Sequence, residues 1–358
     1  MLTVLVAGAL VLGNDPQDSI WDRLDVYANG RLRWESTFDQ LNGEDRQRGR
    51  MRFRVGAAYR LDESLTAEAR LSTASDGRDA NNPHWDFGDG PDGFSGGDIV
   101  LDRFYLSWLP YDTLELRGGK MPHAFQGPPV FGELVWDDDV QPAGASAVWT
   151  PKMDSSWKLD VRLAEYVAVE SSSDTEPAMF GIQGHAKLPL SGTASLELAS
   201  AYMDWSHTEN FANAPSPGNQ GNTSLAGGFG IWDSWIATNV GEGRAKTTVF
   251  GQYLDNLDDD TGEDQGLALG ARVGTLGKRG DWNVFGTYYD LDANAVFSPV
   301  AQDDTPIAGT GTGKGMSGLI AGAQYFLRDN LSFRLWALTS DADEDPFRIR
   351  FDIDFSVK

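Results

Sequence analysis

The sequence predicts an all-β protein: a transmembrane antiparallel β-barrel of about sixteen strands with one loop folded inward. Three observations support this class. Apolar and polar residues alternate with the period of two that a strand with one apolar face requires. Short and long connections between these stretches alternate along the chain. The chain also contains 41 glycines and many aromatic residues, while helical periodicity is scarce, which favours a turn-rich β protein.

Sixteen stretches alternate in this way, and their connections divide into two kinds. Short ones lie at 61–63, 110–112 and 328–330, and long ones at 74–97 and 292–315, among others. Short turns at one end of the barrel and long loops at the other are typical of outer-membrane barrels, whose long loops face the cell exterior. The expected strands cover residues 22–38, 48–60, 64–73, 98–109, 113–120, 142–150, 156–167, 178–188, 193–205, 228–239, 244–255, 265–276, 281–291, 316–327, 331–340 and 347–357.

The second of these stretches shows which face meets lipid. Phe53 and Val55 alternate there with Arg50, Arg52 and Arg54. An arginine on the lipid face near the midplane costs about 2 to 4 kcal/mol. We therefore expect the apolar side chains to face lipid and the three arginines to face a water-filled lumen. An ordinary soluble β protein with core aromatics is the alternative.

Composition excludes several classes of partner and site. Acidic residues number 53 against 29 basic ones, which gives a formal net charge of −24. Nucleic acid is not an expected partner, because phosphate binding needs a basic surface. The chain has no cysteine, so disulfides, thiolate metal sites and cysteine nucleophiles are excluded. No apolar run reaches the roughly 18 residues that a membrane-spanning helix needs.

The N-terminal residues differ in character from the rest of the chain. Residues 1–18 combine a short apolar core with small residues, which is typical of a secretory signal peptide, although a basic first segment is missing. A short buried N-terminal strand is the alternative. Residues 19–358 show no linker or solenoid repeat, so we expect one barrel domain.

The inward arginines gather on a few strands. Closure places the last strand beside the first, so these arginines form one continuous basic wall, which we call the arginine wall. The alternative is a solvated interior whose arginines pair with Glu35, Glu68, Glu115, Asp352 and Asp354. The arginine wall consists of Arg31, Arg33, Arg50, Arg52, Arg54, Arg70, Arg103, Arg117, Arg334, Arg348 and Arg350.

The long connection at 121–141 is unlike the others. It contains Pro128-Pro129 and an apolar set that includes Phe131 and Trp136, which suggests a segment packed against something. We expect it to fold into the barrel as a constriction loop and to oppose its acidic residues to the arginine wall. Opposed charges across a narrow waist would screen solutes by charge and dipole. A surface loop is the alternative. The acidic residues are Glu133, Asp137, Asp138 and Asp139, and His123 at the start of the loop could tune the pore.

The stretch LDRFYLSWLPYDTLELRGGKMP, followed by WDDDVQPAGASAVW, resembles the putative-porin family of Gram-negative outer membranes. The resemblance is firmest over about residues 98–150. It implies a sixteen-stranded outer-membrane channel, often a homotrimer, that passes ions and small hydrophilic solutes. The small-residue stretches at 142–148 and 318–323 are candidate trimer faces. Such barrels commonly end on an aromatic residue, whereas here Phe355 is followed by three further residues.

Other patterns are weaker. GFSGG at 93–97 and GKGMSG at 313–318 match nucleophile-elbow and dinucleotide motifs, but neither has the strand and helix that such motifs need. The acidic stretches 255–264 and 341–345 are expected to form a solvated loop surface, and weak Ca²⁺ or Mg²⁺ binding near lipopolysaccharide is the alternative; no other cofactor is expected. The sequence thus predicts a passive-diffusion porin rather than an enzyme. The alternatives are an outer-membrane barrel hydrolase and a surface adhesin.

Overall fold

The computed structural model describes the barrel wall and part of its loops. The described residues are 19–38, 45–74, 84–87, 97–131, 133–153, 156–167, 177–190, 192–208, 229–302, 304, 315–341 and 346–357. Outside them lie the predicted signal peptide at 1–18 and, of the two short motifs, residues 93–96 and 313–314. Among the described residues, no helix has the length and apolarity needed to cross a membrane.

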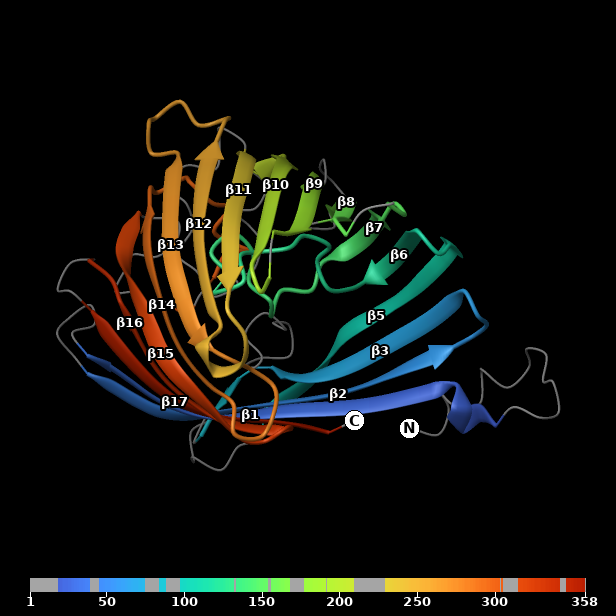
Figure 1. Cartoon of the computed structure of the whole chain (residues 1–358), viewed down its shortest axis with the longest axis horizontal. Coiled ribbons are helices and arrows are strands. Elements are labelled where there is room, and N and C mark those ends of the chain that lie inside the picture. The colour runs from blue at the N-terminus through green and yellow to red at the C-terminus, as the bar shows by residue number, and fades with distance from the viewer. Residues whose placement is uncertain are drawn as a thin grey trace.

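The strands form one closed antiparallel sheet. Each strand of the wall pairs with the next along the chain, and β17 returns to pair with β1, from blue to red in Figure 1. The strands are β1 (Leu24–Phe38), β2 (Arg46–Arg60), β3 (Leu65–Ala74), β4 (Trp85–Asp86), β5 (Asp98–Tyr111), β6 (Leu114–Lys120), β7 (Ala143–Trp149), β8 (Lys158–Val167), β9 (Ala178–Pro189), β10 (Ser195–Ser206), β11 (Phe229–Val240), β12 (Thr247–Asn256), β13 (Gln265–Gly274), β14 (Trp282–Leu291), β15 (Met316–Arg328), β16 (Leu331–Thr339) and β17 (Phe347–Val357), with short 3₁₀ turns η1 (Ile20–Asp22) and η3 (Gly243–Ala245).

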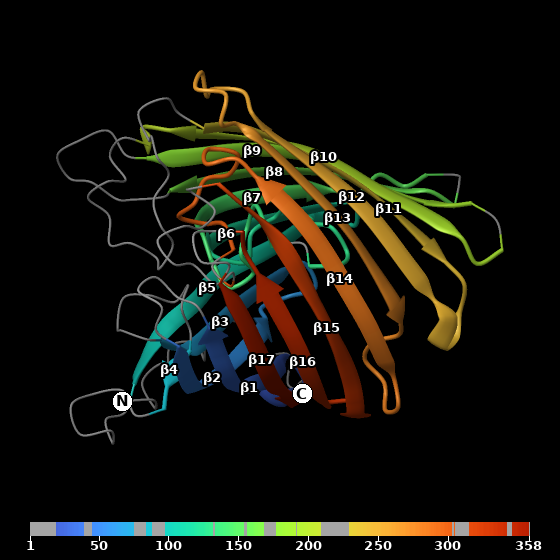
Figure 2. The same cartoon turned by 90° about the vertical axis from the view of Figure 1, so that its left-hand side faces the viewer.

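The prediction of a sixteen-stranded barrel is confirmed. All sixteen predicted strands are present, with bounds that differ from the prediction by three residues at most. The two-residue β4 is additional, and it pairs with β2 where β3 has ended. Figure 2 shows β4 beside β2. The alternation of apolar and polar residues could not predict β4, because two residues are too few to show a period of two.

The register places the apolar side chains outward. Phe53 on β2 is 47% exposed, whereas Arg50 and Arg54 on the same strand are buried. On β17, Phe351 faces outward and Asp352 is fully buried. An outer face of exposed apolar side chains suits lipid, and the inner face takes the charges, as the alternation predicts.

The inner wall is not polar all round. On β10 to β12, the inward side chains include Met203, Trp205, Ile231, Trp235 and Leu254, and all of them are buried. Alternation cannot reveal this arrangement, because a strand with apolar residues on both faces shows no clear period of two. The lumen side of β10 to β12 is therefore mainly apolar and is called the apolar half of the lumen, although Asp233 and Gln252 also point inward there. The arginine-rich β1, β2 and β17 line another side.

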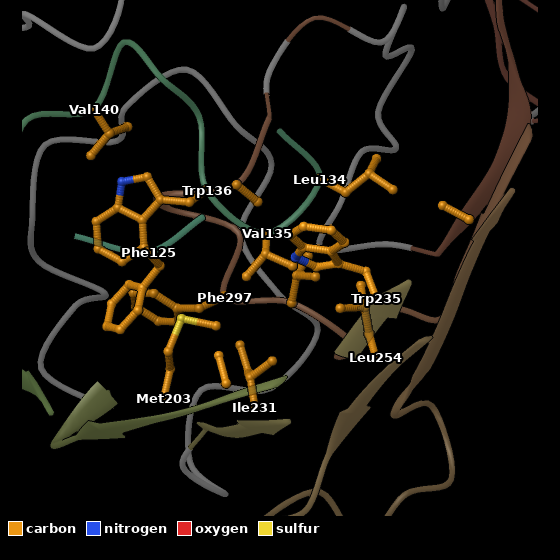
Figure 3. Packing of buried hydrophobic residues seen from close by; sticks show 14 of the residues in the cluster. Phe125, Leu134, Val135, Trp136, Val140, Met203, Ile231, Trp235, Leu254 and Phe297 are labelled. Carbon is orange, nitrogen blue, oxygen red and sulfur yellow. The ribbon is translucent and has the colours of Figure 1, made fainter. Parts of the chain in front are cut away.

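Two chain segments cover the apolar half of the lumen. The inner segment, residues 121–142 between β6 and β7, contributes the buried Phe125, Leu134 and Trp136. Its Trp136 ring stacks on Trp205 at a centroid distance of 5.7 Å. Figure 3 shows these side chains gathered with those of β10, β11 and Phe297. The expectation that 121–141 folds inward and packs against the wall agrees with this geometry.

The second inner segment, residues 292–302 and 304 between β14 and β15, was expected among the surface loops, and that expectation is wrong for these residues. Ala295, Val296 and Phe297 are fully buried, and the Phe297 ring lies 4.3 Å from Trp205 and 5.3 Å from Phe229. Burial of this apolar run against inward aromatics explains its place. Residues 305–314 lie outside the described part of the chain.

Candidate functional site

A cavity of about 780 Å³ lies in the lumen between the arginine wall and the inner segment. Seven of the predicted arginines line it, and so do all four predicted acidic residues. The structure therefore brings together Arg31, Arg33, Arg50, Arg52, Arg54, Arg103 and Arg334 with Glu133, Asp137, Asp138 and Asp139.

Four predicted arginines do not line this cavity. Arg70 forms a buried ion pair with Asp102, and Arg117 binds Glu115 on its own strand at 2.8 Å. Arg348 donates to Thr37 Oγ1 at 3.0 Å and to the Asp304 carbonyl. The fourth, Arg350, binds Glu35 and Asp304.

Asp352 organises the middle of the arginine wall. Its Oδ1 accepts from Arg33 Nε at 2.8 Å and its Oδ2 accepts from Arg33 Nη2 at 3.2 Å. Arg334 on β16 reaches the same Oδ2 at 2.9 Å. The Trp336 indole N–H also donates to this oxygen, at 3.0 Å. A fully buried carboxylate shared by two guanidiniums fixes their positions, because charge-assisted forked bonds are directional.

A neighbouring set of pairs continues the pattern. Glu35 on β1 accepts from Arg48 Nε at 2.6 Å and from Arg350 Nε. Arg50 donates from Nε to Asp86 on β4 at 2.9 Å. The arginine wall is thus a lattice of arginines with interleaved carboxylates, which is the pairing that the alternative interpretation of the sequence expects. Predicted partners Glu35, Glu115, Asp352 and Asp354 each bind an arginine, and Glu68 lies 3.6 Å from Arg103.

The Trp336 ring contacts three guanidiniums of the lattice. The guanidinium carbons of Arg334, Arg350 and Arg33 lie 4.6, 4.9 and 5.4 Å from its ring centroid. Each distance is within the range of a cation–π contact. The tryptophan itself is buried, so these contacts stabilise close packing of like charges where water is scarce.

The inner segment touches the arginine wall through Asp139. Its Oδ1 accepts from Arg52 Nη1 at 3.1 Å and from Arg54 Nη2 at 2.8 Å. Burial disfavours the ionised form of Asp139, but Arg54, Arg52 and Arg31 outweigh burial and lower the pKa of this carboxyl. Asp139 is therefore ionised and bound to the wall, rather than standing opposite it across water.

The other acidic residues of the inner segment face the cavity differently. The Asp138 side chain is 76% exposed, and its carboxylate lies 3.6 Å from His123 Nε2. Burial, and then the carboxylates of Asp138, Asp304 and Asp139, raise the pKa of Glu133. Asp137 is buried and accepts from the Asp139 backbone N–H at 2.7 Å. Glu133 and Asp138 thus supply the acidic side of the cavity.

Side chains of the opposite wall hold the backbone of the inner segment. Gln183 on β9 donates to the Gln126 carbonyl at 3.0 Å and accepts from the Gln126 N–H at 2.8 Å. Trp235 Nε1 donates to the same carbonyl at 3.0 Å. Arg272 on β13 donates to the Pro129 carbonyl at 3.0 Å. These bonds replace the water that an irregular backbone otherwise needs.

Several site residues were missed from the sequence. Arg48 continues the alternation of β2 and could have been found. Asp86, His84 and Asp304 lie in stretches of sequence that were expected to be connections, where no period marks an inward side chain. Asp304 nevertheless binds Arg350 and lies 3.7 Å from Arg33. Arg272 stands alone on a strand without other charges.

No group of three or more His, Asp or Glu side chains among the described residues is placed to hold a metal ion. Residues 342–345 of the second acidic stretch lie outside the described part of the chain. The cavity is lined by guanidiniums of the arginine wall and by acidic side chains of the inner segment.

A family comparison identifies the chain. The model of the putative-porin family matches residues 25–226, which is more than half of the sequence. The chain belongs to the putative-porin family. It is accordingly a channel protein of the bacterial outer membrane. No curated protein matches the sequence of this porin.

Solved porins share the fold at low identity. OprB of Pseudomonas putida, in a high-pH structure, superposes with a TM-score of 0.61 over 94% of this chain and 95% of its own, at 11% identity. OmpF of Salmonella typhi, solved with daunomycin, gives 0.55 over 93% and 97%, at 10% identity. A mutant of the Rh. blastica porin gives 0.53 over 93% and 100%, at 14% identity. These similarities establish the closed barrel fold of this porin.

Proposed function

We propose that this porin conducts ions and small hydrophilic solutes by passive diffusion through the cavity between the arginine wall and the inner segment. The observation that carries the proposal is the composition of the cavity lining. Guanidiniums of β1, β2 and β16 border one side, and the Asp138 carboxylate borders the other, joined by Glu133 where the pH is high enough to ionise it. A permeating solute therefore passes between opposite charges.

The two charged sides would create a field across the pore. A unit charge about 5 Å from an ion in water contributes roughly 0.8 kcal/mol. Screening at about 0.1 M salt reduces this to roughly 0.5 kcal/mol. Each unpaired charge thus changes the local concentration of a monovalent ion about twofold. Because most of the arginines are paired with carboxylates within the wall, the exposed Asp138 has a large share in selectivity.

The test is current through planar bilayers that hold the purified protein under a KCl gradient. Discrete conductance steps are expected, with a reversal potential that reports the preference for cation or anion. D138N should move the reversal potential toward anion preference. E165Q is the matched control, since the exposed Glu165 alternates with the inward Ala164 and Tyr166 and therefore points outward. Silence from folded, inserted protein would refute the proposal.

We further propose a homotrimer that contacts lipopolysaccharide. The outward side chains in the first half of β7 are small, with Ala143 and Ala145 exposed. A patch of this kind, together with 318–323, would allow two barrels to approach closely. Light scattering in detergent should give three protomer masses. A145R should reduce the assembly to monomers, whereas A271R, at an exposed alanine of β13, should leave it intact. A monomer mass for the unmodified protein would contradict the trimer.

Weak Ca²⁺ or Mg²⁺ binding at the acidic stretches 255–264 and 341–345 is also proposed, since carboxylate oxygens suit both ions. Such ions would bridge the porin to lipopolysaccharide phosphates. Equilibrium dialysis with ⁴⁵Ca²⁺ should show millimolar binding that the variant D258N/D259N/D260N weakens. Equal binding by both proteins would exclude the 255–264 site.

A further inference from the structure

We propose that His84 and Arg52, beside Arg31, form a binding site for a small oxyanion, such as the carboxylate or phosphate group of a solute, on the wall of the cavity. The inference rests on the proposed function, because a solute reaches these residues only by entering the pore. It concerns the chemical class of solute that the passage retains.

The three side chains lie side by side on neighbouring segments of the wall, in one row that runs across the strands. β4 runs antiparallel to β2, with Trp85 opposite Met51. His84 immediately precedes Trp85, which brings it level with Arg52. On the other side of β2, Arg52 is paired in register with Arg31 of β1. All three side chains line the same cavity.

The adjacent row shows what is unusual about this one. There Asp86, Arg50, Arg33 and Asp352 follow one another in register, so a carboxylate stands at each end of two arginines. In the row of His84 the only carboxylate is Asp354, which binds Arg31 Nε at 2.7 Å. An imidazole thus occupies the place that a carboxylate has in the adjacent row.

Two donors of this row are buried without a hydrogen-bond partner among the described residues. They are His84 Nε2 and Arg52 Nε. The His84 residue is only 5% exposed. Burial, and then Arg33, Arg50 and Arg52, lower the pKa of His84 well below its ordinary value. A neutral imidazole with its hydrogen on Nε2 donates a hydrogen bond, so both groups offer N–H to an acceptor.

Asp139 shows how the arginines accept a carboxylate. Its Oδ1 bridges Arg52 Nη1 and Arg54 Nη2, which leaves Arg52 Nε for a second acceptor. Guanidinium groups favour two parallel bonds to carboxylate or phosphate oxygens. An oxyanion in the cavity would take one bond from Arg52 Nε and one from His84 Nε2. It would also compete with Asp139 for Arg52.

The experiment measures inhibition of the chloride current through single channels by inorganic phosphate and, separately, by succinate. Both anions should inhibit the unmodified porin. H84A should weaken inhibition by about tenfold, the value expected for one hydrogen bond to a charged group. H84Q, which keeps an N–H donor, should recover most of it. D139N should strengthen inhibition, because Arg52 and Arg54 lose their internal carboxylate. H185Q is the control, since His185 binds Asp160 and Glu197 away from the cavity.

Each outcome either supports or overturns the proposed oxyanion site. Weaker inhibition in H84A with recovery in H84Q supports the site, and inhibition by only one of the two anions identifies the class of solute. Open channels that neither anion inhibits overturn the site, and so does equal inhibition of the unmodified porin and H84A. Absence of any current from folded protein would instead refute the proposed function, and with it the site.

Discussion

Replacing Trp136 by alanine should release the inner segment from the wall of the lumen. Trp136 is 5% exposed, and its ring centroid lies 5.7 Å from those of Trp205 and Tyr166 and 6.4 Å from that of Phe125. Truncation of a buried tryptophan costs about 3 to 5 kcal/mol. The strand hydrogen bonds do not involve this side chain, so the loss falls on the docking of the inner segment.

A loss of that size exceeds the contribution of any one of the hydrogen bonds that remain around Trp136. The Gln126 backbone keeps its bonds to Gln183 and Trp235, and the Pro129 carbonyl keeps Arg272. Each such bond contributes about 0.5 to 1.5 kcal/mol net. We therefore expect W136A to populate conformations in which the inner segment around residue 136 has left the wall. The open cross-section of the pore then fluctuates with time.

Single-channel recording tests this prediction. W136A should show a broader distribution of conductance and more open-channel noise than the unmodified porin. W232A is the matched control, because Trp232 lies on the outer face and is 42% exposed. A gel-shift assay of the heated and unheated protein should show that both variants are folded barrels. Unchanged conductance and noise in folded W136A would refute the packing argument.

Three further predictions concern charge. D352N should lower the temperature at which the barrel unfolds on a gel, since breaking a buried pair costs about 3 to 5 kcal/mol and Arg33 and Arg334 both lose an acceptor; an unchanged unfolding temperature would contradict the role of Asp352 in the lattice. Cation preference should rise as the pH is raised from about 5 to about 9, because Glu133, whose pKa is raised from the ordinary carboxyl value, gains its negative charge within this range. E133Q should flatten that dependence, and a steep profile in E133Q would assign it to another group. D138N should change the reversal potential by an amount that corresponds to about a twofold change in the permeability ratio. That shift should shrink at about 1 M salt, because salt screens the charge. A shift independent of salt would rule out a simple electrostatic origin.

Local pattern was sufficient to predict the wall of the barrel. In β2 and β17 the two faces differ strongly in polarity, so a shift of the register by one residue would place charged side chains in lipid. The short turns fix which strands are neighbours. The sites that depend on alternation, such as Arg52 and Arg334, could be placed for the same reason. The inward fold of residues 121–141 was predictable from its apolar side chains, which a surface loop would expose to water.

Positions in the connections could not be predicted from the sequence. Asp86 and Asp304 bind arginines that are far from them in the chain, and His84 is level with Arg52 only because β4 joins the sheet where β3 ends. No periodicity describes such residues. The apolar half of the lumen was missed for a related reason: inward Trp205 and Trp235 alternate with residues of mixed polarity, so neither face is marked.

The sequence by itself determined the class of fold, the number of strands, the faces of the charged strands and the presence of a basic wall. These features follow from interactions between near neighbours and from the contrast between lipid and water, which act on every strand separately. Only the tertiary structure decided which carboxylate meets which arginine, that a second segment enters the lumen, and that Asp139 binds the wall while Asp138 faces the cavity. These contacts join residues remote in sequence, and their geometry exists only once the barrel has closed and the inner segments have packed inside it.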